Sequence, residues 1–498
     1  MEKLHFNNTE IEEGGKAEGV FWWTQIPNSI LPGQVSDVMI KTSKVPSGPC
    51  EIMLELSNGE ILKKKIETLI PQFFNIVSVG FDFNEDKIFI YLQNNYPNRP
   101  LKIKNIFIGG VDVTKKIKMW NTYILSGEKN CLIYKSTEKL TPGQFLAVKI
   151  ITEEGVIAES LVRVYSHFPV QDFGGDKRRE MFFNEDNFDI HFPSKLEQFE
   201  LYKKLPYYKA YHLLDDPVCQ DANKNGLGAM AKEVIARRKK CWEWDKDHPT
   251  LIYICEYAKP LGYFVYGELA DIIAVDPYEL TYYNNPPERD GYFLEIAKKA
   301  CEPRPVIAIP EAFKYITPKF PKGSKRFPTP EEERLLIYSE IAAGAKGLWY
   351  YVSSGESGYR NNPELEKEIG KINQEIQYLK DYLLIGEPIE MAKTDNQNIK
   401  ADTIFCGDKG IIIILRNGDY ETLWDTEKNN WMTQVNTQLG VRITLNLPWY
   451  FNYKIDSVCT ITAGNKEILP FEEKKGKIII KESEVKIAKP ILIKFKEE

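Results

Sequence analysis

Short apolar runs separated by turn signals dominate both ends of the chain. They lie at residues 38–40, 51–54, 87–92 and 145–151 toward the amino end, and at 410–418, 477–480 and 491–495 toward the carboxyl end. Short strands punctuated by Gly and Pro are typical of antiparallel β-sandwiches. We therefore predict one or two immunoglobulin-like modules over residues 1–160 and a small carboxy-terminal β-sandwich over residues 386–498.

The pattern changes between residues 161 and 385, where buried runs alternate with helical stretches. The strand-like runs lie at 210–215, 250–255, 271–275, 305–310 and 347–352, and the helical stretches at 228–240, 291–301, 330–343 and 364–384. Such alternation indicates βα units and a parallel sheet. We predict a (β/α)8-type barrel, which makes the whole chain a multidomain α/β plus all-β protein.

A closed barrel of this type needs eight strands, and only five are clear. We place the other three at residues 162–165, 181–183 and 188–191. The segment from 160 to 209 is too short for full crossover helices between three strands. The barrel is therefore expected to be abbreviated or distorted at its first strands.

Composition excludes several classes of partner. The net charge is −6 with no long basic block, so neither nucleic acid nor an anionic membrane surface is expected as a partner. No apolar run approaches the roughly 18 residues of a membrane span. The first residues lack an apolar secretory core, which predicts a cytoplasmic location for the chain as given, although a removed leader would leave no trace. Abundant Lys, Glu and Ile hint at a thermophilic source.

The eight cysteines show no CxxC pair and no regular spacing. They are interpreted as reduced core thiols, so neither a structural zinc site nor a disulfide framework is predicted. A metal site built on His212 with the neighbouring acids is the alternative, but only five histidines exist and no second cluster supports it. We therefore expect no metal and no other cofactor.

Two apolar runs end in carboxylates. The run 211–214 ends in Asp215, Asp216 and Pro217, and the run 305–310 ends in Glu311. Barrel enzymes place their chemistry at the carboxyl ends of the strands. Glycoside cleavage needs one carboxyl group as proton donor and a second as nucleophile or base. Neighbouring residues on a strand point to opposite faces, so Asp215 and Asp216 are not expected to share one task. The alternative is that Asp216 and Pro217 only begin a turn.

Further residues at the strand ends are candidates for contacts with a substrate. They are Asp215, Glu256, Asp276, Tyr278, Trp349 and Tyr350. A tyrosine at position 278 would orient the Glu311 carboxylate, and an indole at position 349 would form a sugar-stacking floor. For each of the aromatic residues the alternative is ordinary core packing.

These motifs resemble the clan of TIM-barrel retaining glycoside hydrolases, near its poorly characterised members with an Asp-Glu-Pro after the fourth strand. The resemblance covers roughly residues 205–355 and rests on segments 214–217, 271–278, 310–313 and 333–351. It implies Asp216 as the acid/base and Glu311 as the nucleophile, acting on an oligo- or polysaccharide. The clan normally has Glu where this chain has Asp216, which leaves inversion or lost activity open.

Carboxyl separation distinguishes these mechanisms, at about 5–5.5 Å for retention and about 6.5–9.5 Å for inversion. We expect Asp216 and Glu311 to converge on one open pocket, with Trp349 or Tyr278 in its wall and at least one carboxyl partly desolvated. The second hypothesis is a non-catalytic carbohydrate-binding or scaffold protein with a degenerate barrel. The sugar and the oligomeric state are left open.

Overall fold

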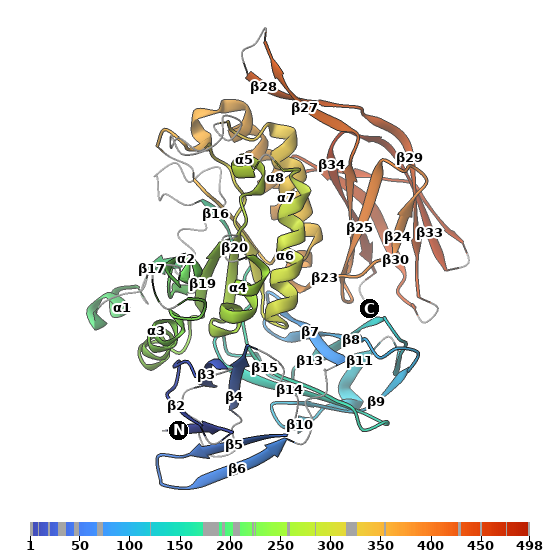
Figure 1. Ribbon diagram of the computed structural model, residues 1–498. Helices are drawn as coiled ribbons and strands as arrows, with labels where there is room; N and C mark the ends of the chain where they lie inside the picture. Colours follow the sequence, from blue (N-terminus) through green and yellow to red (C-terminus); the bar gives the residue numbers. More distant parts are fainter. Residues whose placement is uncertain are drawn as a thin grey trace.

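The chain forms antiparallel β-sheets at both ends and a curled parallel sheet with helices between them (Figure 1). This confirms the predicted fold class. The computed structural model describes residues 3–7, 9–17, 20–27, 36–43, 49–66, 73–119, 121–172, 189–191, 195–202, 210–221, 224, 226–255, 259–283, 285–314, 326–352, 355–426, 430–448, 451–474 and 476–496. Among these residues, no helix combines the length and the hydropathy of a membrane span.

The amino-terminal strands form four antiparallel groups. One sheet has the order β2-β1-β5-β6, a separate pair is β3-β4, and two further sheets have the orders β10-β9-β14-β15, with β12 also on β9, and β11-β13-β8-β7. Their bounds are β1 Lys3–Phe6, β2 Thr9–Ile11, β3 Val20–Ile26, β4 Asp37–Thr42, β5 Cys50–Glu55, β6 Ile61–Ile66, β7 Phe74–Phe81, β8 Lys87–Asn94, β9 Leu101–Ile108, β10 Val111–Asp112, β11 Ile117–Met119, β12 Tyr123–Ile124, β13 Lys129–Lys135, β14 Phe145–Thr152 and β15 Ile157–Arg163. The last two sheets enclose one apolar core, because alternate residues of strands such as β9 and β14 are buried.

Seven parallel strands form the central sheet, in the order β16-β22-β21-β20-β19-β18-β17. Their bounds are β16 Val170–Asp172, β17 Asp189–His191, β18 Ala210–His212, β19 Thr250–Cys255, β20 Ile272–Asp276, β21 Val306–Ala308 and β22 Leu348–Tyr350. All residues of β18, β19, β21 and β22 are buried, as expected of strands covered on both faces. The five clear strand predictions are therefore confirmed, with shorter bounds at most ends.

Of the three predicted first barrel strands, one is wrong, one is confirmed and one lies outside the described residues. Residues 157–163 form β15, which pairs antiparallel with β14, so the prediction of a barrel strand at 162–165 is wrong. Its alternating burial fits a sandwich strand. The strand expected at 188–191 is confirmed as β17, and the one expected at 181–183 lies outside the described residues. The first parallel strand is β16, which pairs with β22 and was not predicted.

The helices are α1 Leu196–Tyr202, α2 Pro217–Asp221, α3 Ala231–Trp244, α4 Lys259–Tyr266, α5 Glu279–Tyr283, α6 Glu288–Cys301, α7 Pro330–Ala342 and α8 Pro363–Ile385. The predicted start of α7 is confirmed, because Thr329 and Glu332 form a complete capping box with Pro330 as the first helical residue. Helices α7 and α8 separate the parallel sheet from the carboxy-terminal strands (Figure 1).

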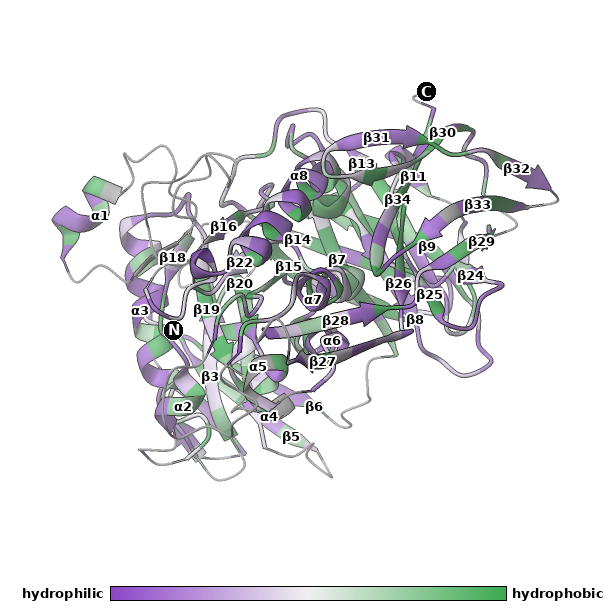
Figure 2. Ribbon diagram, turned by 90° about the horizontal axis from the view of Figure 1, so that it is seen from above, coloured by the Kyte–Doolittle hydropathy of each residue, from purple (hydrophilic) through white to green (hydrophobic). Residues whose placement is uncertain are grey.

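The carboxy-terminal strands form two main sheets and a hairpin. The orders are β23-β25-β26-β34-β30-β31, β24-β29-β33-β32 and β27-β28. Their bounds are β23 Glu387–Pro388, β24 Ala392–Thr394, β25 Ile399–Cys406, β26 Gly410–Asn417, β27 Tyr420–Asp425, β28 Asn430–Val435, β29 Gln438–Asn446, β30 Ile455–Thr462, β31 Asn465–Ile468, β32 Phe471–Lys474, β33 Lys477–Val485 and β34 Ala488–Phe495. Hydrophobic residues gather on central strands such as β19 and β26 (Figure 2).

One buried carboxylate joins the three parts of the chain. Glu387 in β23 is fully buried and accepts from Lys129 of β13 at 2.7 Å and from Lys298 of α6 at 2.5 Å. Burial alone would raise the pKa of Glu387, but the two ammonium groups hold it below its ordinary value. Nearby, the Tyr91 hydroxyl of β8 lies 2.8 Å from the carbonyl of Ile385, at the end of α8.

Candidate functional site

The carboxyl ends of β18 to β22 gather most of the predicted site residues. Along β21, Ile307 and Ile309 belong to the apolar cluster on the inner face of the sheet, with Trp349 of β22. Alternation along a strand places Glu311 on that same face. Glu311, three residues after the end of β21, is fully buried and forms a parallel bridge with Tyr351, which directly follows β22.

Asp216 lies after β18 and is held against β19. Its Oδ1 accepts a hydrogen bond of 2.8 Å from the backbone N–H of Cys255. Its φ of 41° is in the left-handed region, which non-glycine residues seldom adopt and which recurs at functional sites. Burial, and then the charge of Asp215, raise the pKa of the Asp216 carboxyl to about 6, while the hydrogen bond from Cys255 opposes them.

Asp276 lies beside Cys255, because the two residues are partners in the pairing of β19 with β20. Its Oδ1 is buried and accepts no hydrogen bond from the residues that the structure describes. Burial, followed by the charges of Asp216 and Asp215, raises the pKa of the Asp276 carboxyl well above its ordinary value. Two neighbouring carboxyl groups therefore hold protons more tightly than usual at this edge.

Tyr351, directly after β22, responds to the charges of the acids that follow β18 and of Asp276 in β20. Burial raises the pKa of the Tyr351 hydroxyl, and the charges of Asp215, Asp276 and Asp216 raise it further. Tyr351 is the bridge partner of Glu311, whereas Asp216 follows β18, which lies three positions from β21 and four from β22 in the sheet order. The end of β18 and the ends of β21 and β22 are thus within electrostatic range of each other.

An aromatic cluster stands next to Glu311. The ring of Tyr278 lies 5.1 Å from that of Phe313 and 5.8 Å from that of Tyr351, with the second pair stacked. Tyr278 has a φ of 47°, so it shares the left-handed backbone of Asp216. The predicted role of Tyr278 in orienting Glu311 stays a prediction. Phe313 and Tyr351 were not among the predicted site residues, although Phe313 closely follows the strand predicted at 305–310 and Tyr351 lies within the one predicted at 347–352.

The other predicted site residues divide between the two faces of the sheet. Asp215 is exposed beside Asp216. Trp349 lies on the inner face but is only 3% exposed, with its ring 4.9 Å from that of Tyr253 and edge-on to it. Tyr350 is fully buried and donates to Asn373 of α8 at 2.8 Å, so the structure places it on the helix-covered face, away from this edge. Glu256 lies outside the described residues.

Two thiols accompany Asp216. The sulfur atoms of Cys219 in α2 and Cys255 at the end of β19 are 2.9 Å apart. A carboxylate oxygen of Asp216 and the sulfur atoms of Cys219 and Cys255 all lie within 4.8 Å of one another. These three atoms form a set that could hold a metal ion. Two thiolates on a tetrahedral zinc ion stand about 3.8 Å apart, given Zn–S bonds of about 2.3 Å. The two thiols would have to separate to bind zinc.

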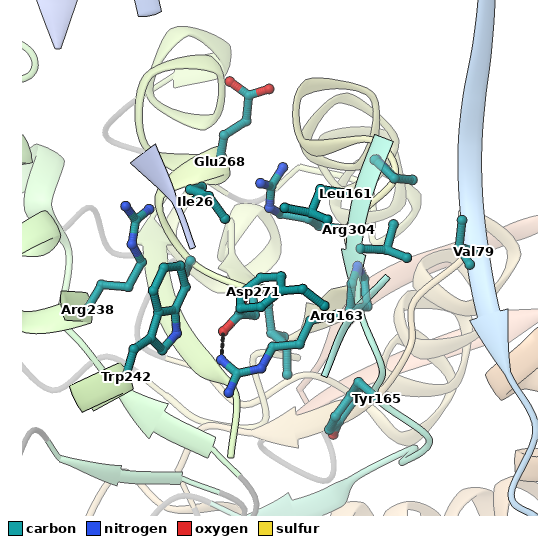
Figure 3. A pocket seen from close by; sticks show the side chains of 16 residues that line it. Ile26, Val79, Leu161, Arg163, Tyr165, Arg238, Trp242, Glu268, Asp271 and Arg304 are labelled. Atoms are coloured by element: carbon teal, nitrogen blue, oxygen red, sulfur yellow. Dashed lines mark hydrogen bonds and ion pairs between the residues drawn. The ribbon is translucent and has the colours of Figure 1, made fainter. Parts of the chain in front are cut away.

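The opposite end of the sheet is built differently. A cavity at the amino ends of the strands is lined by Arg163, Arg238, Trp242, Asp271 and Arg304, among others (Figure 3). Arg163 and Asp271 form an ion pair of 2.7 Å, and Asp271 also accepts from the backbone N–H and the hydroxyl of Thr250 at 2.8 Å. The Arg238 guanidinium lies 4.8 Å from the ring centroid of Trp242. The predicted open pocket at the carboxyl end stays a prediction, because residues 256–258, 315–325 and 353–354, which follow β19, β21 and β22 in the sequence, are outside the described part.

Comparison with known proteins gives likenesses of fold. No protein-family model matches the chain, and no curated protein matches it. Similar solved structures include a cycloisomaltooligosaccharide glucanotransferase of Paenibacillus sp., with TM-score 0.43 and 7% identity over 84% of this chain and 99% of that one. An Anoxybacillus α-amylase has TM-score 0.36 and 13% identity over 61% and 63% of the two chains. A family 5 glycoside hydrolase of Bacteroides vulgatus has TM-score 0.36 and 15% identity over 60% and 65%. Likenesses of this size assign no activity to this chain.

Proposed function

We propose that the protein is a glycoside hydrolase that cleaves oligo- or polysaccharides with two carboxyl groups. The observation that supports this best is that the carboxyl groups of Asp216, Asp276 and Glu311 lie toward the same edge of the parallel sheet. There the Asp216 carboxyl has a pKa of about 6, and Tyr351, the bridge partner of Glu311, is within reach of its charge. A carboxyl group with a raised pKa next to a second carboxylate is the pairing that glycoside cleavage requires.

In the proposed reaction, Asp216 donates its proton to the glycosidic oxygen while the Glu311 carboxylate attacks the anomeric carbon. The bond to the leaving sugar breaks and a covalent glycosyl-enzyme forms. Asp216, now ionised, then takes a proton from water, which attacks the anomeric carbon and releases Glu311. Both steps use the same carboxyl pair, and the configuration at the anomeric carbon is retained.

The aromatic cluster supports a carbohydrate substrate. Tyr278, Phe313 and Tyr351 lie together beside Glu311, and Tyr278 and Tyr351 are partly exposed. Aromatic rings offer apolar faces with polar rims, which suit the alternating apolar and hydroxylated faces of a sugar. The buried Trp349 would support this surface from below.

The test is a substrate screen with a matched pair of variants. Aryl glycosides and plant and microbial polysaccharides are offered to the wild type, to Glu311→Gln and to Glu356→Gln, whose glutamate is exposed in the loop after β22. We expect release of sugar by the wild type and by Glu356→Gln, and a loss on the order of 10⁴-fold or more in kcat for Glu311→Gln.

Proton NMR of the first product assigns retention or inversion. Full activity of Glu311→Gln would remove Glu311 from the mechanism. Sugar binding by calorimetry without turnover by any of the three proteins would favour a carbohydrate-binding protein instead.

A further inference from the structure

We infer that Cys219 and Cys255 form a redox-active pair of thiols, which low-molecular-weight disulfides convert to an intramolecular disulfide beside Asp216. The sulfur atoms are already 2.9 Å apart. A disulfide bond is about 2.05 Å long, so closing it asks for a movement of less than about 1 Å. The site itself follows from this geometry, and only its effect on activity rests on the proposed function.

The two thiols differ in the way that a stepwise oxidation requires. Cys219 is half-buried and reachable from solvent, whereas Cys255 is 5% exposed. The hydrogen bond from the Cys255 thiol lowers the pKa of Cys219 and raises the pKa of Cys255. Cys219 is therefore the group that attacks, and Cys255 is the resolving thiol. The other six cysteines of the chain are all buried.

The oxidation proceeds by two exchanges. The Cys219 thiolate attacks one sulfur of a small disulfide, such as oxidised glutathione, and releases one glutathione thiolate. A mixed disulfide now occupies Cys219. Cys255 then loses its proton, its sulfur attacks Sγ of Cys219, and the second glutathione thiolate leaves. Two protein thiols are oxidised to one disulfide, one glutathione disulfide is reduced to two thiols, and the released thiolates take up the two protons.

The bond would act on Asp216 from two sides. Cys219 follows Asp216 by three residues, and the backbone N–H of Cys255 holds Asp216 Oδ1. Drawing α2 toward β19 shifts the backbone that carries the Asp216 carboxyl. A displacement of about 1 Å at a catalytic group can cost about 10²-fold in rate. We therefore expect oxidation to lower kcat/KM at least tenfold and reductant to restore it.

The experiment needs no substrate for its first readout. The full chain is equilibrated with oxidised and reduced glutathione in a series of ratios, quenched by alkylation, and analysed by intact mass and peptide mapping. We expect a peptide pair joined through Cys219 and Cys255 and a mass loss of two hydrogens. Cys219→Ser and Cys255→Ala should each abolish the joined peptide pair and the mass loss. Cys459→Ala, in the distant strand β30, should leave both readouts unchanged.

Three outcomes would overturn the inference. The first is a native protein that shows no Cys219–Cys255 disulfide at any ratio, and the second is a reaction that stops at the mixed disulfide on Cys219. The third is a tightly bound metal, removed by a chelator, whose loss is needed before either thiol reacts. A protein that forms the expected disulfide but cleaves no glycoside would contradict only the proposed function. A protein that cleaves glycosides but does not form the disulfide would contradict only this inference.

Discussion

The two ends of the parallel sheet use charged residues in opposite ways. At the amino end, the Asp271 carboxylate is paired with Arg163 and also accepts from Thr250, and its pKa is lowered despite burial. At the carboxyl end, Asp216 and Asp276 adjoin other acids and thiols, and their pKa values are raised. None of the largest charge effects on these two carboxyl groups comes from Lys, Arg or His.

Under the proposed function, this contrast would separate a structural end of the sheet from an end that carries the chemistry. The Asp271 charge is compensated by Arg163, so losing either partner would leave an uncompensated charge between the end of β15 and the start of β20. Carboxyl groups that repel each other cost folding free energy, and such costs are concentrated at functional sites. Among the described residues of the parallel-sheet region, the non-glycine residues with a left-handed φ are Asp216 and Tyr278, and both follow strands at the carboxyl end.

After Glu311→Gln, the Asp216→Asn change should produce the largest effect, and it would break the contrast at the carboxyl end. We expect kcat/KM to fall by about 10²–10⁴-fold, because the amide cannot donate the proton. In the wild type the donating form exists below a pKa of about 6, so kcat/KM should fall as pH rises through that value. The variant should lack this limb of the pH profile. Asp247→Asn, an exposed aspartate at the amino end, should behave as wild type. An unchanged pH profile in Asp216→Asn would assign the limb to another group.

Arg163→Ala tests the amino end. It leaves Asp271 buried without its ion-pair partner, which should destabilise the fold by about 3–5 kcal/mol in denaturant unfolding. The pH dependence of this stabilisation follows from the lowered pKa of Asp271. The stabilisation is present at neutral pH and is lost as the pH falls through that pKa. The deficit should therefore shrink in acid. Lys139→Ala, which removes an exposed lysine from its ion pair with Glu85, should cost less than about 1 kcal/mol. Equal losses in the two variants would contradict a special role for the Arg163 pair.

Thr329→Ala tests whether a polar residue at the start of α7, toward the carboxyl end of the sheet, belongs to the site. Its hydroxyl caps α7 by accepting from the backbone of Glu332. Loss of the cap should cost about 1 kcal/mol of stability and leave kcat/KM unchanged. Thr329→Ser keeps the hydroxyl and should retain most of the stability. A parallel loss of activity in Thr329→Ala would extend the site to the start of α7.

Asp215→Asn should give the smallest effect. It removes the charge that, after burial, raises the pKa of Asp216. The alkaline limb of the pH profile should move to lower pH, with kcat at the optimum little changed. A shift in the opposite direction would mean that Asp215 acts on the substrate rather than on Asp216.

Much of the fold could be predicted because strands buried on both faces leave continuous apolar runs. Residues 250–255 and 271–275 are examples, and they became β19 and β20. The strand β16 was missed because its three residues, which follow Pro169, do not form an apolar run. Residues 162–165 were misassigned because a sandwich strand ending in Arg163 was taken for a barrel strand.

The site was harder to predict than the fold. Carboxylates directly after a strand, such as Asp216 and Glu311, are visible in the sequence. The contact between Cys219 and Cys255 joins residues 36 positions apart, and no local pattern marks it. The proximity of Tyr351 to Asp216 depends on the curl of the sheet, which hydrophobic periodicity does not encode.

The buried Glu387 limits how freely the parts of this chain could be exchanged. Its two lysines come from an amino-terminal strand and from a helix of the parallel sheet, while the carboxylate belongs to the carboxy-terminal sheet. A chimera that replaced the amino-terminal strands with another sandwich would have to supply an ammonium group where Lys129 stands. Without it, the buried Glu387 carboxylate would lose one of its two ion-pair partners. Each of the three parts therefore restricts what could replace the other two.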